Sequence, residues 1–457
     1  MLIEVSNTAN QALQSEINRS IIFNYIREKG PVARMEIARN LHISASAVSR
    51  VINSLLREKY VVETEKIETP VGKRPTLLRI NGAKARILSI DLSQDRVRLA
   101  LYDFAGNILR KQRGFRIRGR RESVDELLEE VKSFLDLYIR DSRCTSEHLG
   151  LSAIGIGVPA DIDLASGTIL SACLYDAWYD VNFKQIFEDR FKIPTLLEKD
   201  VTLSALAEKR LGAGRSKSNV AFIEISNGVS AGIICNNQLI RGASGSAGQI
   251  AFGVINKESE LFRSNNPGYL DEHASMKSLL EHTYVELRKG RKSRLRELPE
   301  YDREELDASL VCRAALEGDD VAREVIGEIV HRISSALINL VVTVNPEVLI
   351  LGGHVGDLPG VQELFGRTIA RRISEAIPFT VPDIKISTLG EDGVLIGAYL
   401  LVVEALTAGK FPYRLGTGAE GTDGAQKEEE HGNRDLRLRV HREDPRPGIP
   451  IPVRGED

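Results

Sequence analysis

Several kinds of feature are scarce in this sequence, and each scarcity excludes a class of protein. The 457 residues include four cysteines, at positions 144, 173, 235 and 312, and no two of them form a Cys-x-x-Cys pair. A disulfide framework and a zinc knuckle therefore have no support, and we interpret each cysteine as a small buried hydrophobic residue. Long apolar runs are also missing. The longest near-apolar stretch, residues 394–403, stops at Glu404 and is far shorter than the roughly 20 residues that a membrane span requires.

No targeting signal is visible either. The N-terminus has no basic segment ahead of an apolar core, so we expect a cytoplasmic protein that makes no membrane contact. What is present, 42% apolar and 27% charged residues, is typical of a globular chain with about two to four domains. The net charge of −3 is unevenly spread, because residues 1–80 carry twelve Lys or Arg against eight Asp or Glu. A modestly basic N-terminal region permits contact with phosphate groups at that end.

The pattern of apolar residues divides the chain into three regions. Residues 18–60 show helical periodicity with short turns, and strands alternate with helices from residue 86 to about residue 406. This alternation indicates an α/β architecture. From residue 407 onward Gly, Glu, Arg and Pro dominate without periodic apolar positions. Such a segment cannot bury enough surface to offset its ordering entropy, so we predict a disordered tail at 408–457.

Two strand-rich blocks in the middle region repeat one plan. Residues 87–109 and residues 220–240 each indicate three strands joined by short turns. Such a duplication predicts two similar lobes that face a cleft. Unrelated hairpins within one larger sheet are the alternative on this pattern.

Three short helices are predicted near the N-terminus. The first covers residues 19–28 and the second residues 33–40, and Ser44 is placed to cap a third that begins at Ala45. One side of the third helix is apolar at helical spacing, so that side must be buried. Its residues are Val48, Val51, Ile52, Leu55 and Leu56.

The opposite side of the third helix carries the residues that we expect to bind DNA. Short hydrogen-bonding groups and a forked cation can read base edges and clamp phosphates in a major groove. No acidic residue precedes Glu58 on this helix, whereas a merely solvated helix would carry pairs of Glu and Lys. The predicted DNA-binding residues of the helix are Ser44, Ser46, Ser49, Arg50 and Asn53.

A hairpin follows, with strands at residues 61–64 and 77–80. Its connection contains Lys73 and Arg74, whose cations could lie over the sugar-phosphate backbone as a wing does. The order of these elements predicts a winged helix-turn-helix domain in residues 1–82, with double-stranded DNA as its partner. A helical protein-interaction module is the alternative, and it would bind without a steep dependence on salt.

Further motifs extend this pattern along the chain in a fixed order. They are Asn18 with Arg19, Ser44 to Arg50, Gly72 to Pro75, Gly155 to Pro159, Trp178, Glu198 to Asp200, Arg241 to Gly248, Pro346 to Gly353 and Gly393 to Gly397. With this set the sequence resembles the ROK (repressor, open reading frame, kinase) family from about residue 10 to residue 406. The resemblance implies a winged helix fused to a two-lobed, actin-like sugar-kinase fold. It places lobe 1 at 83–200, completed by a C-terminal helix near 391–407, and lobe 2 at 201–390.

Two loops depart from the pattern of the family's sugar kinases. Those kinases carry Gly-Gly-Thr after the first strand, because glycine lets backbone amides approach the phosphates of ATP. The matching positions here are Ser93, Gln94 and Asp95, and the second phosphate loop, residues 227–232, keeps only part of its glycines. We therefore expect ATP binding to be weak or absent, and we expect no cofactor.

The zinc site of the family kinases is altered as well. The resemblance implies one His and three Cys as ligands. Phe252 stands at the His position, Tyr269 stands at the last Cys position, and residues 254–267 contain no cysteine. These residues cannot hold zinc tetrahedrally, so no metal site is predicted.

The resemblance also implies a sugar pocket in the cleft. Carried over onto this sequence, its residues are Pro159, Lys199, Asp200, Gln249, Phe252 and Asp271. Asp200 matches the kinase general base, which takes a proton from the attacking sugar hydroxyl. With the phosphate loop altered, we expect Asp200 to accept a hydrogen bond from a bound hydroxyl. Gln249 and Phe252 replace the kinases' Glu and His, so the ligand is expected to differ from the kinases' hexoses. It would be a pentose, or a phosphorylated sugar that Lys199 favours; a vestigial cleft without a ligand is the alternative.

Together these patterns predict a sugar-responsive, DNA-binding transcriptional regulator rather than an enzyme. We expect a repressor of carbohydrate-utilisation genes, such as those of xylose metabolism, that acts as a homodimer or a higher homo-oligomer. An active ROK sugar kinase with an accessory DNA-binding domain is the competing prediction, because Asp200, Gly352 and Gly353 are retained. An interaction scaffold without a ligand at either end is the third.

Overall fold

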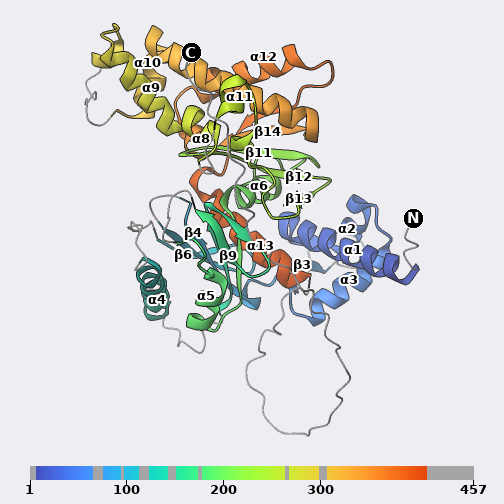
Figure 1. Cartoon of the computed structure of the whole chain (residues 1–457). Helices are drawn as coiled ribbons and strands as arrows, with labels where there is room; N and C mark the ends of the chain where they lie inside the picture. Colours follow the sequence, from blue (N-terminus) through green and yellow to red (C-terminus); the bar gives the residue numbers. More distant parts are fainter. Residues whose placement is uncertain are drawn as a thin grey trace, which may run out of the picture. The chain divides into compact units, whose positions relative to one another are not determined.

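The computed structural model describes residues 7–64, 76–93, 97–112, 123–142, 151–172, 178–262, 267–297 and 306–408. Within these ranges, helices pack on two five-stranded sheets, and a three-stranded sheet lies near the N-terminus (Figure 1). This mixture of strands and helices confirms the predicted α/β class.

The N-terminal region combines three helices with the small sheet. The helices are α1 (Asn7–Lys29), α2 (Arg34–Leu41) and α3 (Ala45–Arg57), and the strands are β1 (Val32–Ala33), β2 (Val61–Thr64) and β3 (Leu77–Ile80). The sheet order is β1-β3-β2 with antiparallel pairs. The predicted helices and hairpin are therefore present, although α1 begins twelve residues earlier than expected. Strand β1 was not predicted, because two residues are too short to show a periodic pattern.

Helix α3 begins and packs as its sequence predicts, with one exception. The hydroxyl of Ser44 accepts a hydrogen bond from the Ala47 amide at 3.3 Å, which caps the helix. The predicted apolar side is buried at Val48, Val51, Ile52 and Leu55. Leu56 was also predicted to be buried, but it is half-exposed, because eight residues carry the helix about 80° past Val48.

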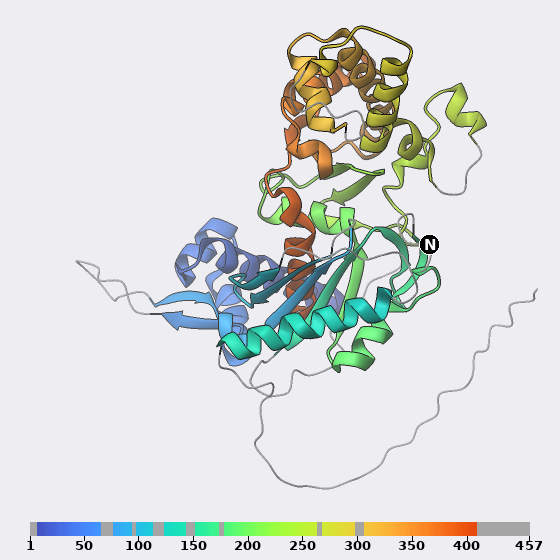
Figure 2. The same ribbon diagram turned by 90° about the vertical axis from the view of Figure 1, so that its left-hand side faces the viewer.

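Lobe 1 is built on a five-stranded sheet in the order β10-β7-β4-β5-β6. Helices α4 and α5 share a core with one face of this sheet, and Figure 2 shows α4 running along it. Phe134 of α4 and Phe187 of α5 are fully buried there. A hairpin of β8 and β9 follows β7. The elements are η1 (Gly82–Lys84), β4 (Arg86–Asp91), β5 (Arg98–Asp103), β6 (Ile108–Gln112), α4 (Ser123–Ser142), β7 (Leu151–Val158), β8 (Ala160–Asp163), β9 (Thr168–Ala172), α5 (Phe183–Phe191) and β10 (Thr195–Lys199).

Lobe 2 repeats this plan around the sheet β13-β12-β11-β14-β15. In both lobes three antiparallel strands are extended by two parallel ones, so the predicted duplication is confirmed and a single larger sheet was the wrong alternative. The turn between β12 and β13 uses Asn236 and Asn237, both with positive φ, as a tight hairpin requires. The strands are β11 (Val220–Ile225), β12 (Val229–Cys235), β13 (Gln238–Ile240), β14 (Val348–Gly352) and β15 (Asp383–Ile386).

Helices cover both faces of the lobe 2 sheet. Helix α6 (Asp200–Arg210) packs on one face. On the other face a large core includes residues of α8, α9, α10, α11 and α12. The remaining elements of the lobe are η4 (Ile250–Phe252), α7 (Lys257–Leu261), α8 (Tyr269–Ala274), α9 (Met276–Arg288), η5 (Arg294–Arg296), α10 (Ala308–Leu316), α11 (Asp320–Val344), η6 (Gly353–Asp357), the π-helical η7 (Gln362–Gly366), α12 (Arg367–Ala376) and η8 (Gly390–Asp392).

Helix α11 has the length and apolar composition that a membrane span would need, which the sequence analysis did not anticipate. The helix also carries charged residues, among them Arg323 and Glu324. Ile329, Ile333 and Leu337 are fully buried in the core of lobe 2. This burial favours the core helix of a globular lobe over a membrane span.

The last helix, α13 (Gly393–Thr407), packs against α6 and against the lobe 1 sheet (Figures 1 and 2). Glycines allow this close approach. A Cβ at Gly397 would overlap the carbonyl of Leu203 in α6, and one at Gly155 in β7 would overlap the carbonyl of Ala398 in α13. The two helices therefore touch backbone to backbone.

We predict that Gly397→Ala lowers the free energy of unfolding by about 2–3 kcal/mol, because the added methyl group overpacks the contact between α6 and α13. The matched control is Gly327→Ala in α11, where a Cβ meets nothing within 4 Å. This control should stabilise the protein by up to about 1 kcal/mol, since alanine favours helix over glycine. Urea unfolding of both variants measures the difference, and equal effects would contradict the proposed backbone contact.

Candidate functional site

The polar side of α3 lies on the surface. Ser44, Ser46, Arg50 and Asn53 are exposed, and Ser49 is half-exposed. The predicted DNA-binding residues of this helix thus share an accessible face. The other two, Lys73 and Arg74, lie outside the described residues.

Arg34 adds a positive charge to this face, and its ion-pair partner Glu63 adds a negative one. The guanidinium of Arg34, at the start of α2, donates to the Asn53 side-chain oxygen at 3.0 Å and pairs with Glu63 of β2 at 3.1 Å. No acid precedes Glu58 on α3 itself, and the acid on this face, Glu63, comes from β2. Sequence reasoning missed Arg34, because nothing in the local pattern pairs it with a residue nineteen positions away.

A second polar group forms where β10 meets α6. The Lys199 ammonium donates to the Ala247 carbonyl at 3.2 Å and lies 3.7 Å from a carboxylate oxygen of Asp161. The side-chain amide of Gln249 donates to the same oxygen at 2.9 Å. The structure therefore brings Lys199 and Gln249 together, as predicted, through a third residue that was not predicted. Asp161 lies two positions after Pro159, which is half-buried at the end of β7.

Two predicted sugar-binding residues have other surroundings. The Asp271 carboxylate accepts hydrogen bonds from the amides of Val229 and Gly268, both at 2.8 Å. Among the described residues no hydrogen bond joins it to the Lys199 group. Its oxygens fix the loop after β11 to the start of α8. Phe252 is 47% exposed, so its ring contributes little to an enclosed pocket.

Three carboxylates gather near the start of α6, of which Asp91 and Asp200 are buried and Glu224 is half-buried. Asp200 is its first residue, Asp91 ends β4, and Glu224 lies near the end of β11. Asp91 forms a buried ion pair with Arg98, whose guanidinium also lies 3.3 Å from Glu391. One oxygen of Glu224 accepts from the Ser226 hydroxyl at 3.2 Å. Its other oxygen is buried and has no hydrogen-bond partner among the described residues.

This grouping changes the protonation of two of the acids. Burial, with the charges of Glu224 and Asp91, raises the pKa of Asp200 well above its ordinary value. Burial and the charge of Asp91 raise the pKa of Glu224 to about 7. Sequence reasoning named Asp200 but missed Asp91, Glu224 and Arg98. A signal was available, since an acid inside an otherwise apolar strand requires a partner.

The positions that match the zinc ligands carry other chemistry. The buried Tyr269 donates its hydroxyl hydrogen to Glu258 at 2.9 Å, and Phe252 has no ligating atom. Across the described parts of the chain, no cluster of three or more His, Cys, Asp or Glu could hold a metal ion. The residues present therefore do not fit the zinc ion that the resemblance implies.

A cavity of about 680 Å³ lies on lobe 2, away from the Lys199 group. Apolar and polar residues both line it, among them Met276, Leu280, Tyr284, His354 and Asp357. Gly353, which precedes His354, is one of the retained glycines on which the competing kinase prediction rests. The cavity thus belongs to the competing kinase prediction rather than to the sugar residues.

Comparison with known proteins decides the family. A family model described as the ROK family matches residues 87–405. The chain belongs to the ROK family. The match begins just after the N-terminal region and covers both lobes and α13.

Two relatives of this ROK protein align over most of its length. The xylose repressor of Caldicellulosiruptor bescii is 28% identical over 401 residues, which are 86% of this chain and 97% of the relative. The DNA-binding transcriptional dual regulator NagC of Escherichia coli is 22% identical over 409 residues, 88% of this chain and 95% of the relative.

Solved structures share the fold. A ROK family transcriptional regulator, a homolog of the E. coli MLC protein, has a TM-score of 0.72 at 21% identity and covers 87% of this chain and 97% of its own. A ROK family glucokinase from Streptomyces griseus, in complex with glucose and AMPPNP, has a TM-score of 0.59 at 22% identity. It covers 69% of this chain and 99% of its own. Regulators and kinases thus share the architecture, and the fold alone does not separate them.

We predict that the stability of the ROK protein falls as pH rises from about 5 to 8. Glu224 binds its proton more tightly in the folded state, so its contribution is present below pH 4.5 and is lost as pH passes about 7. In Glu224→Gln this decline should shrink by on the order of 3 kcal/mol. The control is Glu363→Gln, at an exposed acid. Melting temperatures measured across this pH range test the prediction, and an unchanged slope in Glu224→Gln would overturn it.

Proposed function

We propose that this ROK protein is a sugar-responsive transcriptional repressor that binds double-stranded DNA and acts in the cytoplasm. The observation that carries the proposal is the accessible polar face of α3, placed ahead of a two-lobed ROK body. Relatives named as a xylose repressor and as a DNA-binding regulator, which align over 86% and 88% of this chain, support it.

The N-terminal region is proposed to be a winged helix-turn-helix. Helix α2 ends at His42 in a left-handed conformation, and the tight turn leads directly into α3. This geometry supports a helix-turn-helix, a motif whose second helix enters the major groove. The hairpin of β2 and β3 follows at the position of a wing. Arg50 would contact phosphate or a guanine edge, while Ser46, Ser49 and Asn53 supply shorter hydrogen-bonding groups.

The effector is proposed to be a sugar bound beside Lys199, Asp200 and Gln249. Asp161 belongs to this group, because it accepts from Gln249 and lies beside Lys199. The hydroxyls of the bound sugar would then contact hydrogen-bonding groups from β8, β10 and the loop after β13, some neutral and some charged. Xylose and N-acetylglucosamine are the first candidates, since relatives carry these sugars in their names.

The protein is proposed to bind its sugar without transferring phosphate to it. The amide of Val229, in the second phosphate loop, already donates to the Asp271 carboxylate. Glu224 lies near the end of β11, just before this loop, and Asp91 ends the matching strand β4 of lobe 1. Acids at these positions disfavour a nucleotide, whose phosphates need free backbone amides and positive charge. Ser93 is described, whereas Gln94 and Asp95 of the first loop lie outside the described residues.

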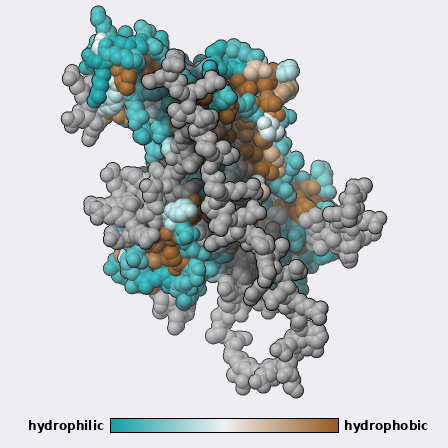
Figure 3. Space-filling model, in the orientation of Figure 1, coloured by the Kyte–Doolittle hydropathy of each residue, from teal (hydrophilic) through white to brown (hydrophobic). Residues whose placement is uncertain are grey.

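Repression is proposed to require at least a homodimer. Two recognition helices related by a twofold axis would contact half-sites of a pseudo-palindromic operator. Among the coloured residues of Figure 3, apolar patches lie between hydrophilic areas. Val342 and Phe379 of lobe 2, 59% and 44% exposed, are large apolar residues of the kind that oligomer contacts cover.

For DNA binding we predict that Arg50→Ala weakens affinity at least about tenfold and reduces the slope of log affinity against log salt by about 1. The control is Arg367→Ala on α12, which removes the same charge from an exposed site of the ROK body. Fluorescence anisotropy with a duplex selected from a random pool by the wild-type protein provides the measurement. Equal losses in the two variants would point to general electrostatic attraction and would argue against α3 as the reader.

An active sugar kinase is the second candidate. Asp200 and the cavity beside Gly353 and His354 favour it, and so does the likeness to a ROK glucokinase. We predict that the purified protein transfers no phosphate from ATP to xylose, glucose or N-acetylglucosamine, because the first phosphate loop lacks its glycines and an amide of the second already donates to Asp271. A coupled assay for ADP release checks this. Turnover that disappears in Asp200→Asn would establish the kinase and refute the proposed loss of catalysis.

A further inference from the structure

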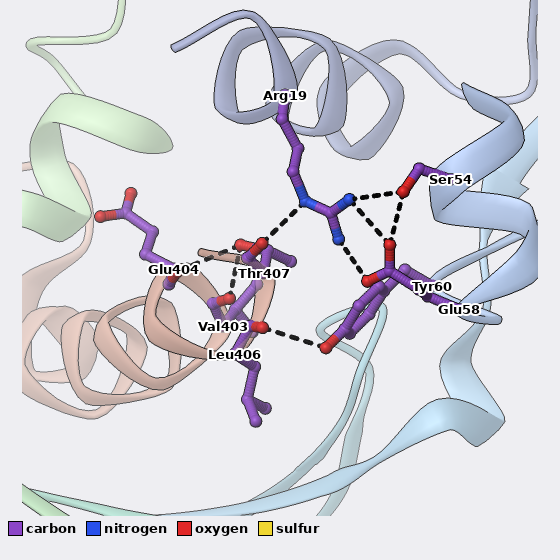
Figure 4. Close-up of polar contacts among 8 residues, drawn as sticks. All are labelled: Arg19, Ser54, Glu58, Tyr60, Val403, Glu404, Leu406 and Thr407. Carbon is purple, nitrogen blue, oxygen red and sulfur yellow. Dashed lines mark hydrogen bonds and ion pairs between the residues drawn. The ribbon is translucent and has the colours of Figure 1, made fainter. Parts of the chain in front are cut away.

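The N-terminal region is fastened to the end of the last helix through two carbonyl groups. The Nε of Arg19, in α1, donates to the Thr407 carbonyl at 2.9 Å. The hydroxyl of Tyr60, just before β2, donates to the Leu406 carbonyl at 3.0 Å in a buried position. Figure 4 shows both side chains reaching the C-terminal end of α13. These carbonyls belong to the last turn of α13, where carbonyls lack the regular hydrogen bond from the amide four residues on.

Arg19 also holds the recognition helix. Its guanidinium forms a two-point pair with Glu58, the residue that ends α3, at 2.6 and 2.9 Å, and it donates to the Ser54 hydroxyl at 3.2 Å. A positive charge at this place also complements the negative end of the α13 dipole. One side chain thus joins α1, the end of α3 and the end of α13 (Figure 4).

Aromatic packing makes this junction stiff. Phe104, in the turn between β5 and β6 of lobe 1, lies between two rings of the N-terminal region. Its centroid is 5.8 Å from that of Phe23 and 5.4 Å from that of Tyr60. Phe23 and Phe104 are almost fully buried. The Tyr399 hydroxyl of α13 donates to the Phe104 carbonyl at 3.0 Å, which ties the same cluster to the last helix.

Helix α13 is in turn fastened to α6, which begins at Asp200 among the proposed sugar residues. Gly397 packs on the Leu203 backbone in the middle of α6. At the far end, Arg210 pairs with Glu404 at 2.7 Å. The path from Asp200 to Tyr60 therefore runs through two helices in backbone contact and one ion pair.

One residue at this junction opposes the attachment. All three guanidinium nitrogens of Arg27, in α1, are buried and have no hydrogen-bond partner among the described residues. Burial lowers the pKa of Arg27 and outweighs the nearby acids Glu404 and Glu28, which raise it. A buried cation without a hydrogen-bond partner is unfavourable. The attached arrangement therefore carries a cost that detachment of the N-terminal region would remove.

We propose that Tyr60 and Arg19 are positioning residues that couple the sugar site to the DNA-reading helix through the α6–α13 pair. Sugar contacts at the start of α6 shift α6 and α13 together. This shift moves the carbonyls of Leu406 and Thr407, to which the N-terminal region is attached. The cost at Arg27 keeps the attached and released arrangements close enough in energy for a small ligand to change their balance. This inference rests on the proposed function.

The experiment uses the full chain and separates three quantities. They are the affinity for the selected duplex without sugar, the affinity of the DNA-free protein for D-xylose, D-glucose or N-acetylglucosamine, and the change in DNA affinity that a bound sugar causes. Anisotropy measures the first and third, and calorimetry measures the second. Tyr60→Phe removes one hydroxyl and keeps the ring. The affinity for the duplex without sugar and the affinity for the sugar should each stay within about threefold of the wild type. The change in DNA affinity that a bound sugar causes should fall about fivefold, as expected when one coupling hydrogen bond is lost.

Two further variants control the result. Tyr25→Phe makes the same chemical change in α1, at a hydroxyl that accepts from Asn40 and lies outside the junction, and it should keep the full sugar effect. Arg27→Met removes the buried cation, so it should raise the melting temperature and, by stabilising the attached arrangement, reduce the change in DNA affinity that a bound sugar causes. An unchanged melting temperature would contradict the cost assigned to Arg27.

The outcomes distinguish the inference from the function beneath it. A Tyr60→Phe protein with the full sugar effect would overturn the coupling role and leave the repressor intact. Equal losses in Tyr60→Phe and Tyr25→Phe would also overturn it, because the effect would then be general to the N-terminal region. If no sugar changes the DNA affinity of the wild type, the proposed function itself fails, and the coupling fails with it.

Discussion

The close contact between α6 and α13 is the constraint on which the rest of this structure depends. Each helix covers one sheet, and the two meet where Gly397 leaves no side chain between them. A shared pair of helices means that neither lobe can change its packing without displacing an element of the other. The lobes therefore behave as a coupled system, and the proposed sugar residues lie at one end of the element that they share.

Charge is distributed unevenly around this helix pair. At the start of α6, the acids Asp91, Asp200 and Glu224 lie with Arg98 and Lys199, so the acids are in excess. At its other end, the guanidinium of Arg27 is buried near Arg210 and Glu404 without a hydrogen-bond partner among the described residues. Neither arrangement favours stability, because buried charged groups that are incompletely paired are costly. Buried charges that lower stability are typical of functional sites, where a protein changes its conformation or its protonation.

The sequence predicted the elements better than the contacts among them. The Ser44 cap, the Asn236–Asn237 turn and the buried side of α3 follow from local rules, and the repeated strand plan predicted both sheets. The site was harder, because its parts come from distant strands. Asp161 pairs with Gln249 across 88 positions and Arg34 reaches Asn53 across nineteen. Lys199, Asp200 and Gln249 could be named through family resemblance, whereas the isolation of Asp271 from them depends on how one loop folds.

The ring of Phe104 has a consequence for how such proteins can be recombined. It belongs to the ROK body by sequence, yet it fills the core of the N-terminal region between Phe23 and Tyr60. A cut at η1, near residue 82, would leave a cavity in the N-terminal region and an exposed apolar ring on the ROK body. The N-terminal region therefore cannot be exchanged by itself. A chimera that exchanges N-terminal regions between family members would also need to transfer the β5–β6 turn and the end of α13.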